Sequence, residues 1–209
     1  MLKDNLKQYI LEVKEQASQN GDEKKIELFK EEREYIEKNS FLFDDLFGTI
    51  SFTEKDPSLR FSDAVIERCD KETENLLANE VALFLNQPIQ YLKKQKNEFI
   101  YLESKWFDLI RVESISLEAD DVFGTYDVML GLKLQKKFDA TLKSFLNTNL
   151  QGEGSKFDLV FSHDDGLWDL NFALNYVSGF HEEMSIGEAY QIIYHLLFNL
   201  AEAVEMGRS

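Results

Sequence analysis

The stretch Tyr126-Asp127-Val128-Met129-Leu130-Gly131-Leu132-Lys133-Leu134-Gln135 decides the fold of the second half of the chain. A large apolar residue stands at every second position, a period that places these side chains on one face of an extended strand. The same period returns in residues 168–177, with Trp168, Leu170, Phe172, Leu174 and Tyr176. The sequence therefore predicts two half-buried strands.

Each of these strands is preceded by an extended stretch and followed by a helix. The preceding stretches are residues 107–119 and 156–162, and the joining turns are residues 119–125 and 163–166. Helices are predicted over 136–148 and 185–205, the second beginning with a capping box of Ser185 and Glu188. The order ββα-ββα predicts an α+β fold, an antiparallel sheet with helices packed on one face.

The N-terminal 40 residues read as a separate element. Apolar residues at spacings of three and four predict a helix over 2–19, and a second such stripe follows Asn20-Gly21. We interpret residues 1–40 as a helical hairpin, packed on or appended to a body of residues 41–209. A helical surface of this kind is a candidate seam for a homodimer.

The connection between these parts is less regular. We expect a short strand near residues 49–53, an extended stretch over 59–68, and a helix from Asp70 to about Gln87 that Pro88 ends. The helix would turn Leu77, Val81, Phe84 and Leu85 inward. Residues 89–106 fit a helix or a strand equally well.

Composition bounds the class of protein. The 209 residues are 44% hydrophobic and 13% aromatic, which is typical of a globular chain with a sizeable core. The single cysteine, Cys69, cannot form an internal disulfide, and the first residues lack the apolar run of a signal peptide. The interrupted apolar stretch 189–201 is too short to cross a bilayer. We expect a cytoplasmic protein that does not enter the membrane.

The net charge of −16 points to the kind of partner. Residues 1–40 contribute −2, residues 41–135 contribute −8 and residues 136–209 contribute −6. Such a surface repels phosphate backbones and disfavours direct nucleic-acid binding. It favours a basic protein partner or imitation of a nucleic acid's charge, or it serves solubility alone.

Two similar triplets are the candidate catalytic or metal-binding residues. His163-Asp164-Asp165 and His181-Glu182-Glu183 both lie in predicted connections, and imidazole with carboxylate suits a zinc, manganese or iron site. The weak catalytic candidates are His163, Asp165, His181 and Cys69, and the weak metal ligands are His163, Asp164, His181 and Glu182. Acidic residues at turns and helix starts also have purely structural uses.

Other chemistry finds little support. Cys69 precedes a predicted helix start, where a thiolate is favoured, but the neighbouring acidic residues oppose ionisation and free cysteines are usually inert. The glycines form no phosphate-binding loop and no nucleophile elbow, so we expect no cofactor. The aromatic residues Phe41, Phe43, Phe47, Phe99, Tyr101, Trp106 and Phe107 fit an apolar ligand cavity, a partner surface or an ordinary core.

These observations favour a non-enzymatic binding or interaction module that forms a homo-oligomer through a helical surface and meets a basic partner. One alternative is a small metal-dependent or acid–base hydrolase that uses the two His-acid-acid loops. The other is an acidic nucleic-acid mimic, which requires carboxylates arrayed in two rows on one face.

Overall fold

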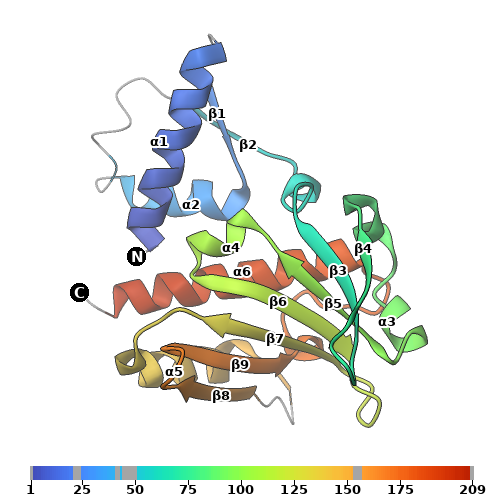
Figure 1. Cartoon of the computed structure of the whole chain (residues 1–209). Coiled ribbons are helices and arrows are strands. Elements are labelled where there is room, and N and C mark those ends of the chain that lie inside the picture. Colours follow the sequence, from blue (N-terminus) through green and yellow to red (C-terminus); the bar gives the residue numbers. More distant parts are fainter. Residues whose placement is uncertain (1, 21–24, 41–42, 44–50, 153–156, 208–209) are drawn as a thin grey trace. The chain divides into compact units, whose positions relative to one another are not determined.

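The structure is a computed structural model that describes residues 2–20, 25–40, 43, 51–152 and 157–207 (Figure 1). The chain divides into two compact units, residues 1–60 and 61–209. The boundary lies between Arg60 and Phe61, whereas the sequence analysis placed it at residue 40. Each unit is described separately below.

The second unit is built on a seven-stranded antiparallel sheet in the order β4-β3-β5-β6-β7-β9-β8. The α+β class and the antiparallel sheet are as predicted. The strands are β3 (Val65–Asp70), β4 (Leu76–Glu80), β5 (Glu98–Glu103), β6 (Val112–Ala119), β7 (Tyr126–Leu132), β8 (Phe157–Ser162) and β9 (Leu167–Ala173).

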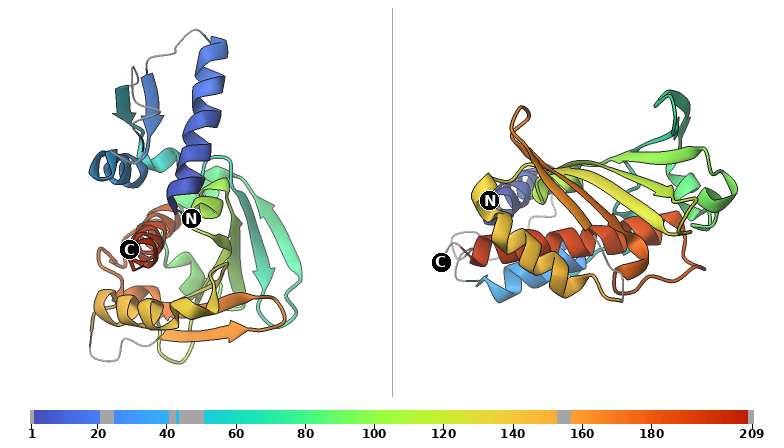
Figure 2. Two further views of the ribbon diagram at one scale, coloured as in Figure 1. Left: turned by 90° about the vertical axis from the view of Figure 1, so that its left-hand side faces the viewer. Right: turned by 90° about the horizontal axis from the view of Figure 1, so that it is seen from below.

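The alternation read from the sequence sets the two faces of this sheet. In β7 the buried residues are Tyr126, Val128, Leu130 and Leu132, and the residues between them are partly exposed. The neighbouring strands β6 and β9 show the same alternation, so their buried side chains share one face with those of β7. Figure 2 shows that α5 (Asp139–Asn149) and α6 (Ile186–Met206) lie on that same face. We call the opposite face of the sheet the outer face.

Helix α6 forms the centre of the core. The predicted capping box is present, with the Ser185 hydroxyl accepting from the Glu188 backbone and the Glu188 carboxylate accepting from the Ser185 backbone. The Tyr190 hydroxyl is fully buried and donates to the Ile100 carbonyl of β5 at 3.0 Å, which fixes the helix to the sheet. The polar stripe that includes His195 and Asn199 is the partly exposed side of an otherwise buried helix.

The predicted helix over residues 70–87 is wrong. The structure has β3, a turn, β4 and the 3-10 helix η3 (Ala82–Asn86) there. Asp70 does not begin a helix, because its carboxylate accepts from the backbone of Glu72 and Thr73 and closes a local turn. Glu74 then adopts a positive φ of 57°, and the chain reverses into β4. Of the residues expected to point inward, Leu85 is buried and Leu77 and Val81 are exposed.

The remaining elements of the second unit are short. Residues 89–106, left open by the sequence, hold α3 (Tyr91–Lys94), β5 and the start of α4 (Lys105–Leu109). The 3-10 helix η4 (Lys136–Phe138) leads into α5, and the 3-10 helix η5 (Leu174–Tyr176) follows β9. Each pair β6-β7 and β8-β9 is therefore followed by a helix, as the sequence predicted.

The first unit contains a small parallel sheet besides its helices. Its elements are α1 (Leu2–Asn20), β1 (Lys25–Leu28), α2 (Lys30–Lys38), β2 (Ser51–Glu54) and the 3-10 helix η2 (Pro57–Leu59). The second arm of the predicted hairpin is thus a strand followed by a shorter helix. Its core includes a buried ion pair in which Arg60 bonds both carboxylate oxygens of Glu32, at 2.7 and 3.0 Å.

Candidate functional site

The triplet His181-Glu182-Glu183 is tied to the fold through Glu182. Its carboxylate accepts from Lys93 Nζ at 2.7 Å and from the Tyr126 hydroxyl at 2.9 Å. The hydrogen bond from Lys93, with a smaller contribution from the one from Tyr126, holds the pKa of Glu182 below its usual range. Glu182 therefore links the loop before α6 to helix α3 and to strand β7. The exposed His181 lies 3.5 Å from the carboxylate of Glu183.

The triplet His163-Asp164-Asp165 forms the turn between β8 and β9. His163 Nε2 lies 3.0 Å from Lys136 Nζ, and the Asp165 carboxylate accepts from the Ser162 hydroxyl at 2.7 Å. Gly166 closes the turn with a φ of 70°. Asp165 therefore stabilises the turn to which it belongs.

The structure does not bring the two triplets together. His163 follows β8 beside the end of β7 that holds Leu132, whereas Glu182 bonds to Tyr126 at the other end of β7. The seven residues of β7 separate these ends by about 20 Å at ~3.3 Å per residue, while metal ligands lie ~2 Å from their ion. Among the described residues, no group of three His, Cys, Asp or Glu side chains is arranged to hold a metal ion.

Cys69 lies on β3 and not before a helix. Its side chain is buried, and burial together with the nearby Glu67 raises the pKa of the thiol. A raised thiol pKa disfavours the thiolate, which is the nucleophilic form. The geometry at Cys69 is that of a packed cysteine.

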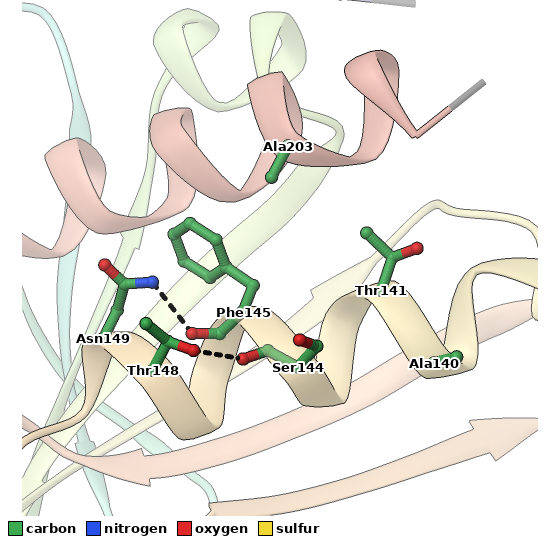
Figure 3. Close-up of a pocket in the computed structure, with 7 residues that line it drawn as sticks. All are labelled: Ala140, Thr141, Ser144, Phe145, Thr148, Asn149 and Ala203. Carbon is green, nitrogen blue, oxygen red and sulfur yellow. Dashed lines mark hydrogen bonds between the residues drawn. The ribbon is translucent and has the colours of Figure 1, made fainter. Parts of the chain in front are cut away.

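A shallow cleft of about 480 Å³ lies between α5 and α6 (Figure 3). The polar side chains that Figure 3 draws bond within their own helix, Thr148 to the Ser144 carbonyl and Asn149 to the Phe145 carbonyl. None of the lining residues that the structure describes carries an acidic or basic side chain, and the polar groups of the cleft are hydroxyls and one amide. Its lining residues are Ala140, Thr141, Ser144, Phe145, Thr148, Asn149 and Ala203.

The aromatic residues of the predicted cluster point in different directions. Trp106 and Phe107 of α4 are buried, whereas Phe99 and Tyr101 of β5 are only partly buried. The register of β5 places Phe99 and Tyr101 on the outer face, opposite to its buried residues Ile100 and Leu102. Phe43 is buried in the first unit, and Phe41 and Phe47 lie outside the described residues.

The outer face carries an unusual concentration of carboxylates near the β6–β7 turn. Glu118 and Asp127 are directly opposite each other on β6 and β7. Burial raises the pKa of both carboxyl groups, and for Asp127 the nearby Asp120 adds to this effect. Asp127 also contributes to the raised pKa of Glu118, as expected for like charges in opposed positions of a sheet.

Two lysines partly balance these carboxylates. Lys71 Nζ lies 3.4 Å from Glu118 Oε1 and also donates to the Ala119 carbonyl at 2.5 Å. Lys96 Nζ lies 3.4 Å from Asp121 Oδ1. Residues 118–127 themselves contain four acidic residues and no basic one, so a negative excess remains after both contacts. We call residues 118–127 the acidic turn.

The tip of the acidic turn is apolar and firmly held. Val122 and Phe123 are 81% and 82% exposed, and the Asp120 carboxylate accepts from both of their backbone N–H groups at 2.7 and 2.6 Å. Gly124 has a φ of 67°, which suits its place in the turn. The acidic turn therefore exposes two large apolar side chains to solvent, and hydrogen bonds within the turn hold their backbone.

Sequence reasoning identified residues 119–125 as a turn and did not propose them as a site. The available signal was Asp120-Asp121-Val122-Phe123-Gly124, in which two large apolar residues occupy a turn where polar ones are usual. The opposition of Glu118 and Asp127 depends on strand register, which the alternation pattern alone does not specify.

Comparison of the chain with models of protein families, with curated proteins and with solved structures finds no match.

Proposed function

We propose that this chain is a non-enzymatic binding module that recognises a basic protein partner through the acidic turn. The observation that carries the proposal is the combination of the opposed pair Glu118 and Asp127 with the exposed, hydrogen-bonded tip Val122-Phe123. No catalytic step is part of the proposal.

Electrostatics support a cationic partner. A lysine or arginine placed beside Glu118 and Asp127 would lower the pKa of both carboxyl groups and relieve their mutual repulsion. Binding would then release protons, so affinity should rise as pH increases through the raised pKa values of these groups. The net charge of −16 adds long-range attraction that salt screens.

The apolar tip supports a protein as the partner. Binding energy at protein interfaces is concentrated in a few large side chains that insert into pockets and are ringed by polar residues. Phe123 is exposed at the tip, and Asp120 and Asp121 precede it in the same turn. On the outer face the acidic residues are interspersed with Phe99, Tyr101 and Met129, a pattern that favours a protein interface over two continuous carboxylate rows that imitate nucleic acid.

We further propose that this binding takes place in the cytoplasm. A single buried cysteine is typical of proteins of reducing compartments. None of the helices that the structure describes is long and apolar enough to cross a membrane.

The test uses a synthetic peptide of alternating lysine and leucine residues as a cationic, apolar probe, with a glutamate–leucine peptide as the reverse-charge control. We expect the full chain to bind the first peptide and not the second in isothermal titration calorimetry, with an affinity that falls as salt is added. Asp127→Asn should weaken binding by about 1.4- to 5-fold, the equivalent of one exposed ion pair of ~0.2–1 kcal/mol.

Matched variants locate the interaction. Asp164→Asn makes the same chemical change in the turn at the other end of the sheet and should leave the affinity unchanged. Phe123→Ser should weaken binding about tenfold or more, since it removes an aromatic anchor worth ~1.5–3 kcal/mol when buried. Val160→Ser, at an exposed residue of β8, is its control. Equal effects of Asp127→Asn and Asp164→Asn would contradict the proposal.

A further inference from the structure

The outer edge of β4 is an apolar, nearly uncharged surface on a strongly acidic protein. β4 ends the seven-stranded sheet, and no described strand pairs with its second edge. Leu76 and Leu77 of β4 are about half exposed. Val81, which follows β4, and Leu83, in the first turn of η3, are 71% and 73% exposed. An edge strand with exposed apolar side chains is a template for pairing with another chain.

The usual protections of an edge strand are sparse here. Between Glu74 and Lys93 the sequence contains one charged residue, Glu80, and that residue is bound to Arg68 Nε at 2.7 Å. The Arg68 guanidinium is held by Glu98 as well, at 2.9 Å, so Glu80 belongs to a closed network on the sheet. The edge therefore presents almost no unpaired charge to an approaching chain.

We infer that two copies of this chain associate through β4, edge to edge and antiparallel about a two-fold axis near Asn79. We call residues 76–83, which comprise β4 and the start of η3, the β4 strip. Leu76 and Leu77 stand at its strand end, and Val81 and Leu83 at its η3 end. A two-fold axis between the ends brings the leucine end of one copy against the Val81–Leu83 end of its partner, which makes the strip self-complementary.

The local backbone favours this position of the axis. Arg68 pairs with Ala78 and Cys69 with Leu76, so Leu77 is an extra residue where β4 is irregular. Regular pairing with a second copy is therefore expected on the C-terminal side of Leu77. An axis near Asn79 places the neutral amides of the two copies at the centre and keeps each Glu80 beside its own Arg68.

The distribution of charge selects a second copy as the occupant. Two bodies of net charge −16 repel each other across most of their surfaces, and the β4 strip is a place where they can approach without opposing carboxylates. Salt screens the remaining repulsion, since the Debye length falls from about 10 Å at 0.1 M to about 3 Å at 1 M. Association through β4 should therefore strengthen with salt, opposite to the salt response of a basic partner.

Sedimentation equilibrium of the full chain, at several protein concentrations and at about 0.1 and 1 M NaCl, tests the inference. We expect a monomer–dimer equilibrium that shifts toward dimer at high salt. Val81→Lys or Leu83→Lys should raise the dimer dissociation constant about tenfold or more, because the apolar contact is lost. Each substitution also makes the chain less negative, so general electrostatics alone would strengthen association.

Two control variants complete the design. Val122→Lys makes the same change at a residue that is 81% exposed but lies on the acidic turn, and should not weaken the dimer. Leu11→Lys, on the exposed side of α1, tests a helical dimer seam and should also leave the dimer intact. Thermal unfolding of each variant verifies its folding, and Leu83→Lys decides the matter if Val81→Lys does not fold.

The inference is overturned by a chain that stays monomeric at every concentration and salt level. It is also overturned by a dimer that keeps its affinity in both β4 variants, by one that weakens as salt increases, or by one that Leu11→Lys disrupts and the β4 variants do not.

Discussion

Replacing Asp127 by asparagine should stabilise the protein while weakening its binding of a cationic partner. The side chain lies opposite Glu118, and burial raises the pKa of both carboxyl groups, so the ionised pair is unfavourable in the folded state. Asparagine removes one charge and keeps an oxygen that accepts the bond from the Thr125 hydroxyl, 3.1 Å away. Glu118 remains paired with Lys71 in the variant.

The size of the gain follows from the cross-strand position of the pair. Like charges directly opposite each other in a sheet cost about 0.2–1 kcal/mol, so Asp127→Asn should raise the free energy of unfolding at neutral pH by about that amount. For a chain of this length the melting temperature should increase by at most ~2–4 °C. Glu118→Gln should stabilise less, because it also removes the ion pair with Lys71.

The pH dependence tests whether the gain comes from removing an ionised carboxylate. Asp127 has a raised pKa in the folded state, so the folded protein binds this proton more tightly than the unfolded chain does. The resulting stabilisation is complete below the ordinary carboxyl pKa and is lost as pH rises through the raised value. The advantage of Asp127→Asn over the wild type should therefore be present at pH 7 and shrink as the solution is acidified.

Urea unfolding of the two proteins, monitored by circular dichroism at a series of pH values, measures this advantage. Asp164→Asn is the control for a carboxylate that is not opposed across the sheet. An Asp127→Asn protein that is less stable than the wild type at pH 7, or whose advantage does not change with pH, would refute the reasoning.

Three further predictions concern other parts of the structure. Glu32→Ala should destabilise the unit of residues 1–60 by about 3 kcal/mol, because it leaves the Arg60 guanidinium buried beside fewer partners. Limited proteolysis should therefore cleave that unit faster. The control is Glu34→Ala, which removes an exposed ion pair with Lys30. Cys69 should react with a thiol reagent much more slowly in the folded protein than in urea, and fast reaction of the folded protein would contradict its burial. Ser185→Ala should cost about 1 kcal/mol in urea unfolding through loss of the α6 cap, and an unchanged midpoint would show that the cap contributes nothing.

The parts of the fold that the sequence predicted are those with local, two-sided patterns. Strands β7 and β9 lie between a buried face and a partly exposed one, so their alternation is written directly in the chain. Helix α6 was predicted because Ser185 and Glu188 form its cap and its polar residues occupy one stripe.

The helix predicted over residues 70–87, where the structure has β4 and η3, was wrong for a physical reason. Leu77, Val81, Phe84 and Leu85 have helical spacing, but β4 is an edge strand whose side chains are mostly exposed, so it lacks the alternation that marks inner strands. Asp70 resembles a helix cap in sequence and instead closes a turn with Thr73. Local propensity does not distinguish an aspartate that caps a helix from one that closes a turn.

The candidate site depended on contacts between distant segments. The pattern of the two histidine triplets did not indicate that the length of β7 separates them. It also did not indicate that Lys93 and Tyr126 donate hydrogen bonds to the carboxylate of Glu182. The acidic excess of residues 41–209 did indicate that a charge-dependent partner should bind this part of the chain. The acidic turn gives that expectation specific residues.

The most direct test of the central claim is to map where the lysine–leucine peptide binds. In two-dimensional NMR spectra of the isotope-labelled chain, we predict that the amide signals of residues 118–127 shift most as the peptide is added and that salt reverses the shifts. Signals of the cleft residues Ser144 and Phe145 should not move. Shifts centred on the α5–α6 cleft or on residues 1–60, with the acidic turn unchanged, would contradict the account.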